Sequence, residues 1–499
     1  MTIFLAEVTG YDPVAGTEVV LHFSSQAISP FRSGDGYRPD QFYDPRIVDI
    51  TPFTKSMFGS GRTSGSTASG GGSLVLSNAD NGLDAYHTWG FAGRKCELYV
   101  GEQEQDFANY ALVLTATIEQ PLYAFGGDSA ATVTFKLRDK VRVLDVPIQE
   151  NLYLGTNATT GVYEGTEDDL LDKPKPLCFG ECLNITPVPC NTTLHHYQIH
   201  DGPIEAITTV YDAGEVVTYY TEDLANGYFT LTQPPAGAIT CNVKGAKPSV
   251  YLSTVADIVQ HIVETYGGIA TGDIDTASIT DLNTANSATV GIYITEDTTI
   301  IAVIDELLSS ISGFWGFDGL SRFFVGRLAV PTGTSLATFT NTDLIDIKYI
   351  ESGDEQGNIP IYKVQLGYKK IFTVQNDGDL AGIITPQRRL RLKKQYLTAT
   401  RTDVTVKVVH LLAGVIKRDT LLITGAGTEA NRLLTLYKTV RDFLAIVVEF
   451  NEANAALTLG SIITLQVNRI GLSAGKKFII TSATPYSPAL NQIEFEVWG

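Results

Sequence analysis

Apolar and polar residues alternate through much of the first 145 positions. The stretches EVVLHF, KCELYV, YALVLTATI and ATVTFKLRD follow this alternation, and Gly, Asp and Asn turns separate them. A period of two is typical of half-buried β strands. Residues 1–145 are therefore predicted to form a β domain. The Gly/Ser-rich segment from Gly59 to Gly72 is expected to be a surface loop that is mobile or ordered only by a neighbour.

A helical period appears between residues 251 and 340. The apolar residues of STVADIVQHIVETYGG recur three and four positions apart, Ser253 or Thr254 can cap the start, and Gly267 stops the pattern. His261 lies off the apolar stripe and is expected to face solvent. TTIIAVIDELLSSISG predicts a second helix, and FWGFDGLSRFFVG a hairpin with its turn at Asp318-Gly319. This region is predicted to be an α+β module.

Short strands are predicted on both sides of this module, at 146–250 and 341–499. The segment TEANRLLTLYKTV predicts one helix in the C-terminal part. The expected fold class is α+β and predominantly β, with several barrel-like or sandwich β domains and two small helix-containing modules. The predicted domains are 1–145, 146–250, 251–340 and 341–499.

The net charge of the chain limits the kinds of partner that it is expected to bind. The chain has 36 basic and 55 acidic residues, a formal net charge of −19, which disfavours tight nucleic-acid binding outside a local basic face. The one basic cluster is Arg388–Lys394. Read as a strand, it places Arg389, Arg391 and Lys393 on one face, with Asp377 or Asp379 as ion-pair partners. Neither a secretory signal nor an apolar run of membrane-spanning length is visible, so no membrane segment is expected.

The stretch KPLCFGECLNITPVPCNTTLHHYQIHDG, residues 175–202, holds three of five cysteines and three of seven histidines. Cys178, Cys182 and Cys190, with Cys241 further on, supply four thiols that could hold zinc or an iron–sulfur cluster. Their spacing matches no zinc-finger or ferredoxin pattern. Buried free thiols are the favoured interpretation, and a metal site or a Cys-His catalytic pair are the alternatives.

Catalytic motifs are not evident. The one Gly-x-Ser-x-Gly pattern is at residues 471–475, which lie between two predicted strands and so lack a strand-Ser-helix setting, and His-Glu-x-x-His is absent. The glycines of the Gly/Ser-rich segment are not followed by the Lys of a phosphate-binding loop. The chain is therefore predicted not to be an enzyme.

Several longer stretches resemble the tail-tip or baseplate hub proteins of tailed bacteriophages. They include ANRLLTLYKTVRDFLAIVVEF, LTLGSIITLQVNRIGLSAGKKFIITS, ALNQIEFEVWG, FKLRDK, KPKPLCFGECLNITPV and PPAGAITCNVKG, and the helix-then-hairpin unit at 253–330. The resemblance spans nearly the whole chain, and its motifs are strand-and-turn patterns.

The resemblance implies a virion protein, assembled in the host cytoplasm and located at the tail tip. Such hubs are homotrimers that join the six-fold tail tube, through a distal tail ring, to a three-fold tip or fibre. DNA crosses their channel without specific binding, so an acidic or neutral lumen is expected. A tail-associated cell-wall hydrolase and a carbohydrate-binding adhesin are the alternative functions.

The resemblance also bears on the cofactor. Some related hubs, the lambda-type minor tail proteins and gene-transfer-agent hubs, carry an iron–sulfur cluster on four cysteines. Cys178, Cys182, Cys190 and Cys241 are the positions that could match. The expectation is no cofactor, with an iron–sulfur cluster as the alternative.

Overall fold

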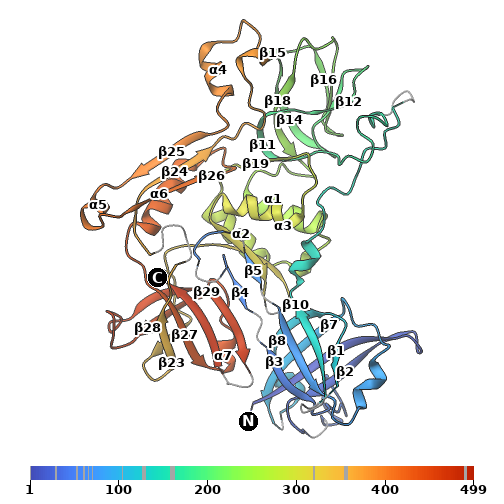
Figure 1. Cartoon of the computed structure of the whole chain (residues 1–499), viewed down its shortest axis with the longest axis vertical. Helices are drawn as coiled ribbons and strands as arrows, with labels where there is room; N and C mark the ends of the chain where they lie inside the picture. Colours follow the sequence, from blue (N-terminus) through green and yellow to red (C-terminus); the bar gives the residue numbers. More distant parts are fainter. Residues whose placement is uncertain are drawn as a thin grey trace.

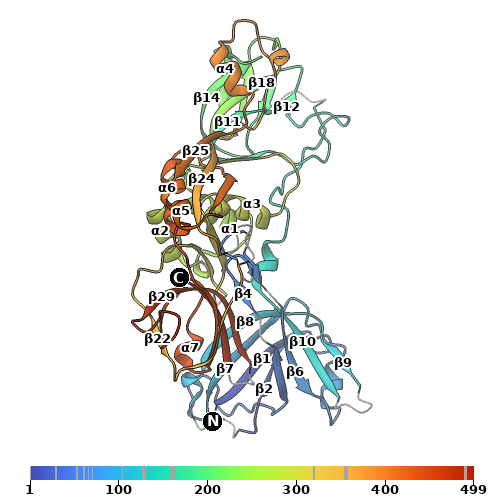
Figure 2. The same cartoon turned by 60° about the vertical axis from the view of Figure 1, so that its left-hand side comes forward.

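The computed structural model shows an elongated molecule with two β sheets at one end, a helical module in the middle and a second β region at the other end (Figures 1 and 2). The predominantly β, α+β fold class is confirmed. No helix among the described residues is long and apolar enough to cross a membrane. The structure describes residues 2–28, 31–51, 54–59, 62–65, 67–69, 71–103, 105–125, 131–157, 163–318, 321–352, 358–487 and 492–499.

The N-terminal sheet has the strand order β2-β1-β7-β8-β10-β6-β3, with β9 paired to β10. Along β1, Phe4, Ala6 and Val8 enter the main core, while Ile3 and Leu5 enter a smaller core on the opposite face. Both faces of this strand are therefore covered. The strands are β1 (Thr2–Asp12), β2 (Thr17–Ser24), β3 (Ile47–Thr51), β6 (Gly72–Ser77), β7 (Lys95–Glu102), β8 (Ala111–Ile118), β9 (Leu122–Ala124) and β10 (Thr132–Arg138).

The β region at the far end consists of two sheets. One has the order β15-β14-β18-β11-β19 and the other β12-β13-β17-β16. A core rich in Ile, Val and Cys lies here. The strands are β11 (Leu177–Ile185), β12 (Val188–Asn191), β13 (His196–Gln198), β14 (Ile204–Asp212), β15 (Glu215–Val217), β16 (Tyr220–Asp223), β17 (Tyr228–Leu231), β18 (Ile239–Ala246) and β19 (Gly291–Ile294).

The helical module confirms both predicted helices. Helix α1 (Val255–Thr265) begins at Thr254, whose side chain accepts the N–H of Asp257, and α3 (Ile300–Ser309) begins at Thr299. The predicted hairpin is β20 (Gly313–Phe317) with β21 (Phe323–Arg327); Gly319 of its predicted turn lies outside the described residues. A further helix, α2 (Thr276–Ala285), packs against β21. His261 is half-buried beside Phe179 rather than facing solvent, a correction to the sequence prediction.

The C-terminal part divides between two sheets. Strands β22, β28, β29, β30, β27 and β23 form the sheet beside the N-terminal one, and β25-β24-β26 form a smaller sheet against α6. The predicted helix is α6 (Ala426–Tyr437). The remaining bounds are β22 (Ala337–Thr340), β23 (Leu344–Tyr349), β24 (Ile361–Tyr368), α4 (Pro386–Leu392), β25 (Leu397–Thr402), α5 (Thr405–Val409), β26 (Gly414–Asp419), β27 (Phe443–Glu449), α7 (Glu452–Ala455), β28 (Ile462–Gln466), β29 (Lys476–Ser487) and β30 (Gln492–Trp498).

The Gly/Ser-rich segment is partly built into the fold. Strand β4 (Lys55–Ser56) pairs with both β5 (Ala68–Ser69) and β29, so it extends the C-terminal sheet. Thr63 is buried, and its carbonyl accepts the hydroxyl of Tyr437. The expectation of a loop that is mobile or ordered only by a neighbour is therefore wrong for these residues, since the chain's own C-terminal part holds them. Residues 60, 61, 66 and 70 lie outside the described residues.

Candidate functional site

The structure places three of the four predicted ligand cysteines in one core. Cys178 and Cys182 lie on β11 and Cys241 on the adjacent β18, where Ile185 is opposite Cys241. All three are fully buried among apolar side chains. Burial, followed by the neighbouring Cys178, raises the pKa of Cys182 and of Cys241 well above the usual thiol value. Cys182 and Cys241 are therefore neutral thiols in this apolar core, and a metal ion would bind them only by displacing their protons.

Cys190 lies apart from this trio. It belongs to β12 in the other sheet, and its Sγ donates to the carbonyl of His196 at 3.4 Å. Burial raises its pKa to about 12. Within the described part of the chain, no group of three or more His, Cys, Asp and Glu side chains is arranged to hold a metal ion. The four cysteines do not fit a four-thiolate cluster in this arrangement. The cluster stays a prediction, for which iron and zinc analysis of the purified protein is the measurement.

The histidines of the same stretch have structural environments. Nδ1 of His200 accepts the backbone N–H of Cys178 at 3.1 Å, and burial lowers the pKa of His200 to about 3. His196 stacks on Tyr163 with ring centroids 3.7 Å apart, and burial lowers its pKa to about 4. Both rings are neutral at pH 7. His195 is in the left-handed region at φ 52°, as a turn residue. None of them forms a Cys-His pair with the geometry of a nucleophile and its base.

The basic cluster is a helix, not the predicted strand. Thr385 caps α4 by accepting the N–H of Arg388, and Pro386 occupies its first turn. The predicted partner Asp377 is confirmed: Lys393 approaches it at 2.7 Å and Arg389 at 3.6 Å. Arg391 instead donates to backbone carbonyls, including that of Lys394 at 2.6 Å. Asp379 bonds to the backbone N–H of Asn376.

Helix α4, in the C-terminal part of the chain, packs against the far β region. The guanidinium of Arg388 lies 4.0 Å from the ring centroid of Tyr211, and its Nε donates to the carbonyl of Gly214. Leu380, Ile384 and Leu392 form a small apolar core with Ile371. The basic residues thus serve an intramolecular contact.

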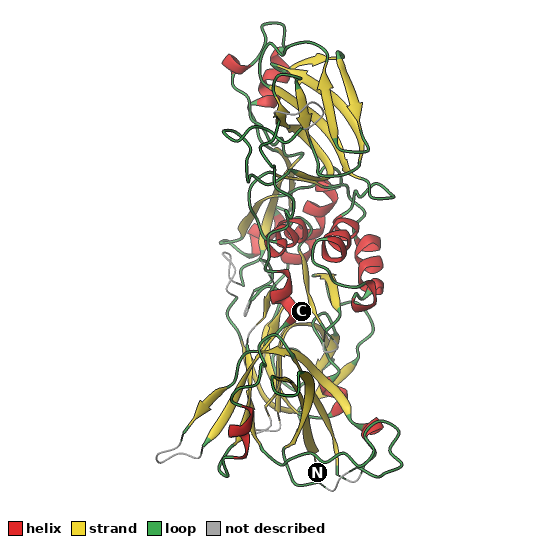
Figure 3. Ribbon diagram, turned by 90° about the vertical axis from the view of Figure 1, so that its right-hand side faces the viewer, coloured by secondary structure: helices red, strands yellow, loops and turns green. Residues whose placement is uncertain are grey.

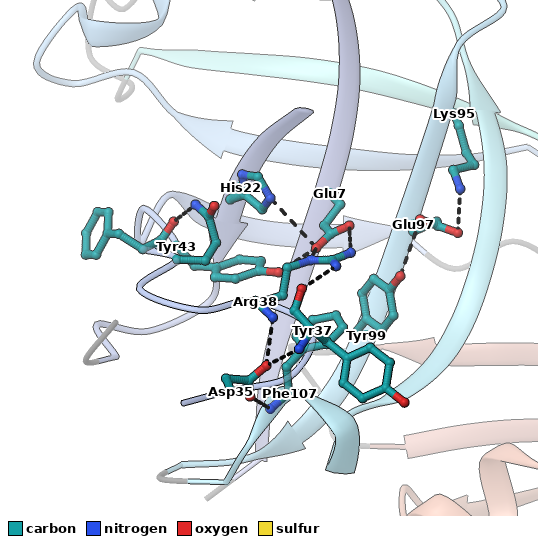
Figure 4. A network of polar contacts seen from close by, with 12 residues as sticks. Glu7, His22, Asp35, Tyr37, Arg38, Tyr43, Lys95, Glu97, Tyr99 and Phe107 are labelled. Carbon is teal, nitrogen blue, oxygen red and sulfur yellow. Dashed lines mark hydrogen bonds and ion pairs between the residues drawn. The ribbon is translucent and has the colours of Figure 1, made fainter. Parts of the chain in front are cut away.

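A buried carboxylate organises the outer face of the N-terminal sheet (Figure 4). Glu7 on β1 accepts Nε (2.7 Å) and Nη2 (2.9 Å) of Arg38 and the hydroxyl of Tyr43 (2.6 Å). Burial alone would raise the pKa of Glu7, but these hydrogen bonds outweigh it and the pKa is lowered. Asp35 accepts the backbone N–H groups of Tyr37, Arg38 and Phe107. The segment that carries Arg38 and Tyr43 is thereby clamped over β1.

One pocket has a basic lining despite the acidic chain. A cavity of about 430 Å³ lies among the Gly/Ser-rich segment, β26 and the connection between α6 and β27. Arg62, Lys417, Arg418 and Arg441 line it, and none of its described lining residues is acidic. Arg441 is partly buried over the ring of Trp498, and burial lowers its pKa. Such donors suit an oxyanion, a carboxylate or a phosphate.

Comparisons with known proteins give no match to a family model and none to a curated protein. In structure, the chain is similar to the tail protein from Neisseria meningitidis MC58, with 10% identity, a TM-score of 0.45, and coverage of 100% of this chain and 96% of that one. It is also similar to the 43 kDa tail protein of prophage MuSo2 from Shewanella oneidensis, with 11% identity, a TM-score of 0.39, and coverage of 92% and 95%.

A third similar structure is an E. coli component of the type VI secretion system, described as structurally similar to bacteriophage T4 tail proteins. It has 9% identity and a TM-score of 0.32, with coverage of 91% of this chain and 74% of that one.

Proposed function

We propose that this chain is a structural subunit of the tail-tip or baseplate hub of a bacteriophage-type tail, and that it works as a homotrimer. The observation that carries the proposal is the pair of eight-stranded sheets at one end of the molecule. They lie side by side (Figure 1), and their side chains share one apolar core, in which the rings of Phe4 and Phe450 are 6.0 Å apart. Three copies around an axis would present six such sheets.

Six sheets on three chains would allow the hub to connect a six-fold ring to a three-fold tip. A six-fold tube ring needs six similar contact surfaces, and three chains with two sheets each can supply them. The opposite end has one β region per chain, which matches a three-fold tip (Figure 3). Cyclic assembly of this kind also covers sheet edges that a single chain leaves open.

The charge of the chain suits a conduit for DNA. With −19 on each chain, three chains carry 3 × 19 = 57 excess negative charges. DNA has one charge per ~1.7 Å of its axis, so a negative wall lets it pass without being held. We propose an acidic or neutral lumen, contacts with tail-tube and tip or fibre proteins, and no enzymatic role.

The test measures the mass of the assembled protein and its location in the particle. Native mass spectrometry of the purified 54.0 kDa chain should show a species of 3 × 54.0 = 162 kDa. Antibody labelling of particles should mark the tail end. A chain that stays monomeric at high concentration, together with label absent from the tail end, would overturn the proposal. A cleared zone on a cell-wall zymogram would favour the hydrolase alternative, and binding to whole cells the adhesin.

A further inference from the structure

The segment Val404–Leu412, between β25 and β26, presents a concentration of exposed apolar side chains. We call it the apolar tip. Its exposed fractions are 68% for Val404, 80% for Val408, 73% for Val409, 85% for Leu411 and 80% for Leu412. Figure 1 shows it at the left edge of the molecule, around α5. Scattered exposed apolar residues are ordinary, but a contiguous group of this kind marks a contact surface.

The tip is an ordered structure rather than a loose loop. Val406 is its one buried large side chain and anchors α5. The N–H of His410 donates to the carbonyl of Val406 at 2.8 Å, and the N–H of Ala413 to that of His410 at 2.9 Å. Nζ of Lys407 lies 4.1 Å from the ring centroid of Tyr362. The backbone that carries the exposed apolar side chains is therefore ordered, which lowers the entropy cost of binding a partner.

A second exposed apolar strip lies on the opposite side. Residues 143–154 lead from the N-terminal sheet to the far β region, and Figure 1 shows them on the right, rising from the level of α3 to that of the far β sheets, where Tyr153 bonds to Gln198 of β13. Exposed fractions are 44% for Val143, 41% for Val146, 42% for Leu152 and 64% for Leu154. The backbone is pinned, since the N–H of Ile148 donates to the carbonyl of Thr298. This segment is the receiving strip.

We infer that the apolar tip of one copy docks on the receiving strip of the next copy in a closed ring. A ring needs two different, complementary surfaces on opposite sides of each subunit. This chain has two apolar ones, and the start of the strip, where the carbonyl of Val146 accepts the N–H of Ile300 on α3, lies at about the height of α5. Their charges are compatible, since the tip carries Lys407 and no carboxylate, and the strip carries Asp145 and Glu150. The inference rests on the proposed trimer and names its contact.

Cysteine cross-linking tests the contact directly. All five native cysteines are buried, so introduced thiols are the accessible ones. The double variant Leu411→Cys/Val146→Cys should, after mild oxidation, give disulfide-linked species up to three chains on a denaturing gel. A mixture of the two single variants should stop at two linked chains, and each single variant alone should give none. Linkage of Leu411→Cys alone would show a tip-to-tip contact and overturn the inference.

A charge variant tests the same contact without requiring disulfide geometry. Leu411→Asp/Leu412→Asp should abolish the trimer in sedimentation experiments. Its thermal midpoint should shift by less than about 2 °C relative to an unassembled wild-type sample, because both side chains are exposed. Val14→Asp, at a residue 94% exposed in the β1–β2 turn, is the matched control and should leave the trimer intact.

The outcomes separate the two proposals. If the wild-type chain and the tip variant both form trimers, the docking contact is wrong and the proposed hub survives. If the wild-type chain never trimerises, the contact is wrong as well, and labelling of the tail end then decides the proposed hub independently.

Discussion

His200 is a histidine that the fold keeps uncharged. Burial lowers its pKa to about 3, while an unfolded histidine titrates near ~6.5. Between these values the unfolded chain binds more protons than the folded chain, so folding stability falls as the pH falls. The full contribution of this group is present above the unfolded pKa and is lost progressively below it.

The variant His200→Asn isolates this contribution, because an amide oxygen can still accept the N–H of Cys178. Urea unfolding between pH 7 and pH 4.5 should show a shallower loss of stability for the variant. The difference in slope should approach ~1.4 kcal/mol per pH unit below pH ~6. Identical slopes for the two proteins would mean that His200 is not held neutral.

The buried carboxylate of Glu7 requires Arg38 as its counter-ion. Replacing Arg38 with Met removes both guanidinium hydrogen bonds and leaves a 6% exposed carboxylate with the hydroxyl of Tyr43 and the ring of His22, whose Nε2 lies 3.8 Å away. Denaturant unfolding should show a loss of ~3–5 kcal/mol. The matched control is Arg94→Met, whose partner Glu18 is 61% exposed and whose loss should cost under ~1 kcal/mol. Equal losses would contradict the importance assigned to burial.

Residue-level predictions from the sequence succeeded where the partner is close in the chain. The pairing of Asp377 with Arg389 and Lys393 joins residues only 12 and 16 positions apart. The position of Cys190 could not be predicted, because spacing does not reveal that the chain turns after Ile185 and enters a different sheet. The neutrality of His200 depends on burial from α1 and β11, which has no local signal.

At the scale of elements, Glu429 ties helix α6 to the helical module. It is 2% exposed and accepts Nη2 of Arg432 at 2.6 Å and a guanidinium hydrogen bond from Arg327. Arg432 also donates to the carbonyl of Leu328 at 2.7 Å. Burial, then the neighbouring Arg432, lowers the pKa of Arg327 to about 10. Both arginines would be left without a carboxylate partner there if Glu429 lost its charge.

The variant Glu429→Gln should therefore cost ~2–5 kcal/mol of unfolding free energy and should increase trypsin cleavage between β21 and α6. Asp403→Asn is the comparison, since the Lys438–Asp403 pair, at 3.3 Å, is partly exposed and its loss should shift the unfolding midpoint much less. If both variants unfold at the same denaturant concentration as wild type, α6 is held by its apolar face alone.

A comparison of the helices shows which of them the sequence pattern predicts. Helices α1 and α3 combine a capping Thr with a broad apolar stripe, so they were predictable. Helix α2 buries only Ile279 and Leu282, too few positions to set a period. The Arg-Leu-Arg-Leu alternation in α4 is typical of a strand, whereas Thr385 and Pro386 are the local signals of a helix start.

For the whole molecule, the sequence indicated the β-rich class and the helix-containing middle. It could not indicate that β4 and β5 join the sheet of β29, because a pairing between distant segments leaves no periodic trace. The side-by-side position of the two large sheets, on which the proposed trimer depends, also comes from tertiary packing alone.

Because β4 pairs with β29, the N-terminal part of the chain cannot complete its fold until the C-terminal part has been synthesised. The hydrogen bond from Ser482 to the carbonyl of Lys55 spans 427 residues. At synthesis rates of ~5–20 residues per second, the ribosome needs about 20–90 s to deliver the partner strand. During that interval the edge of β4 has no β29 to pair with, and Met57 and Phe58 lack their final cover. A ribosome stalled before residue 476 would therefore hold a nascent chain with an exposed, aggregation-prone edge, ready for capture by a chaperone.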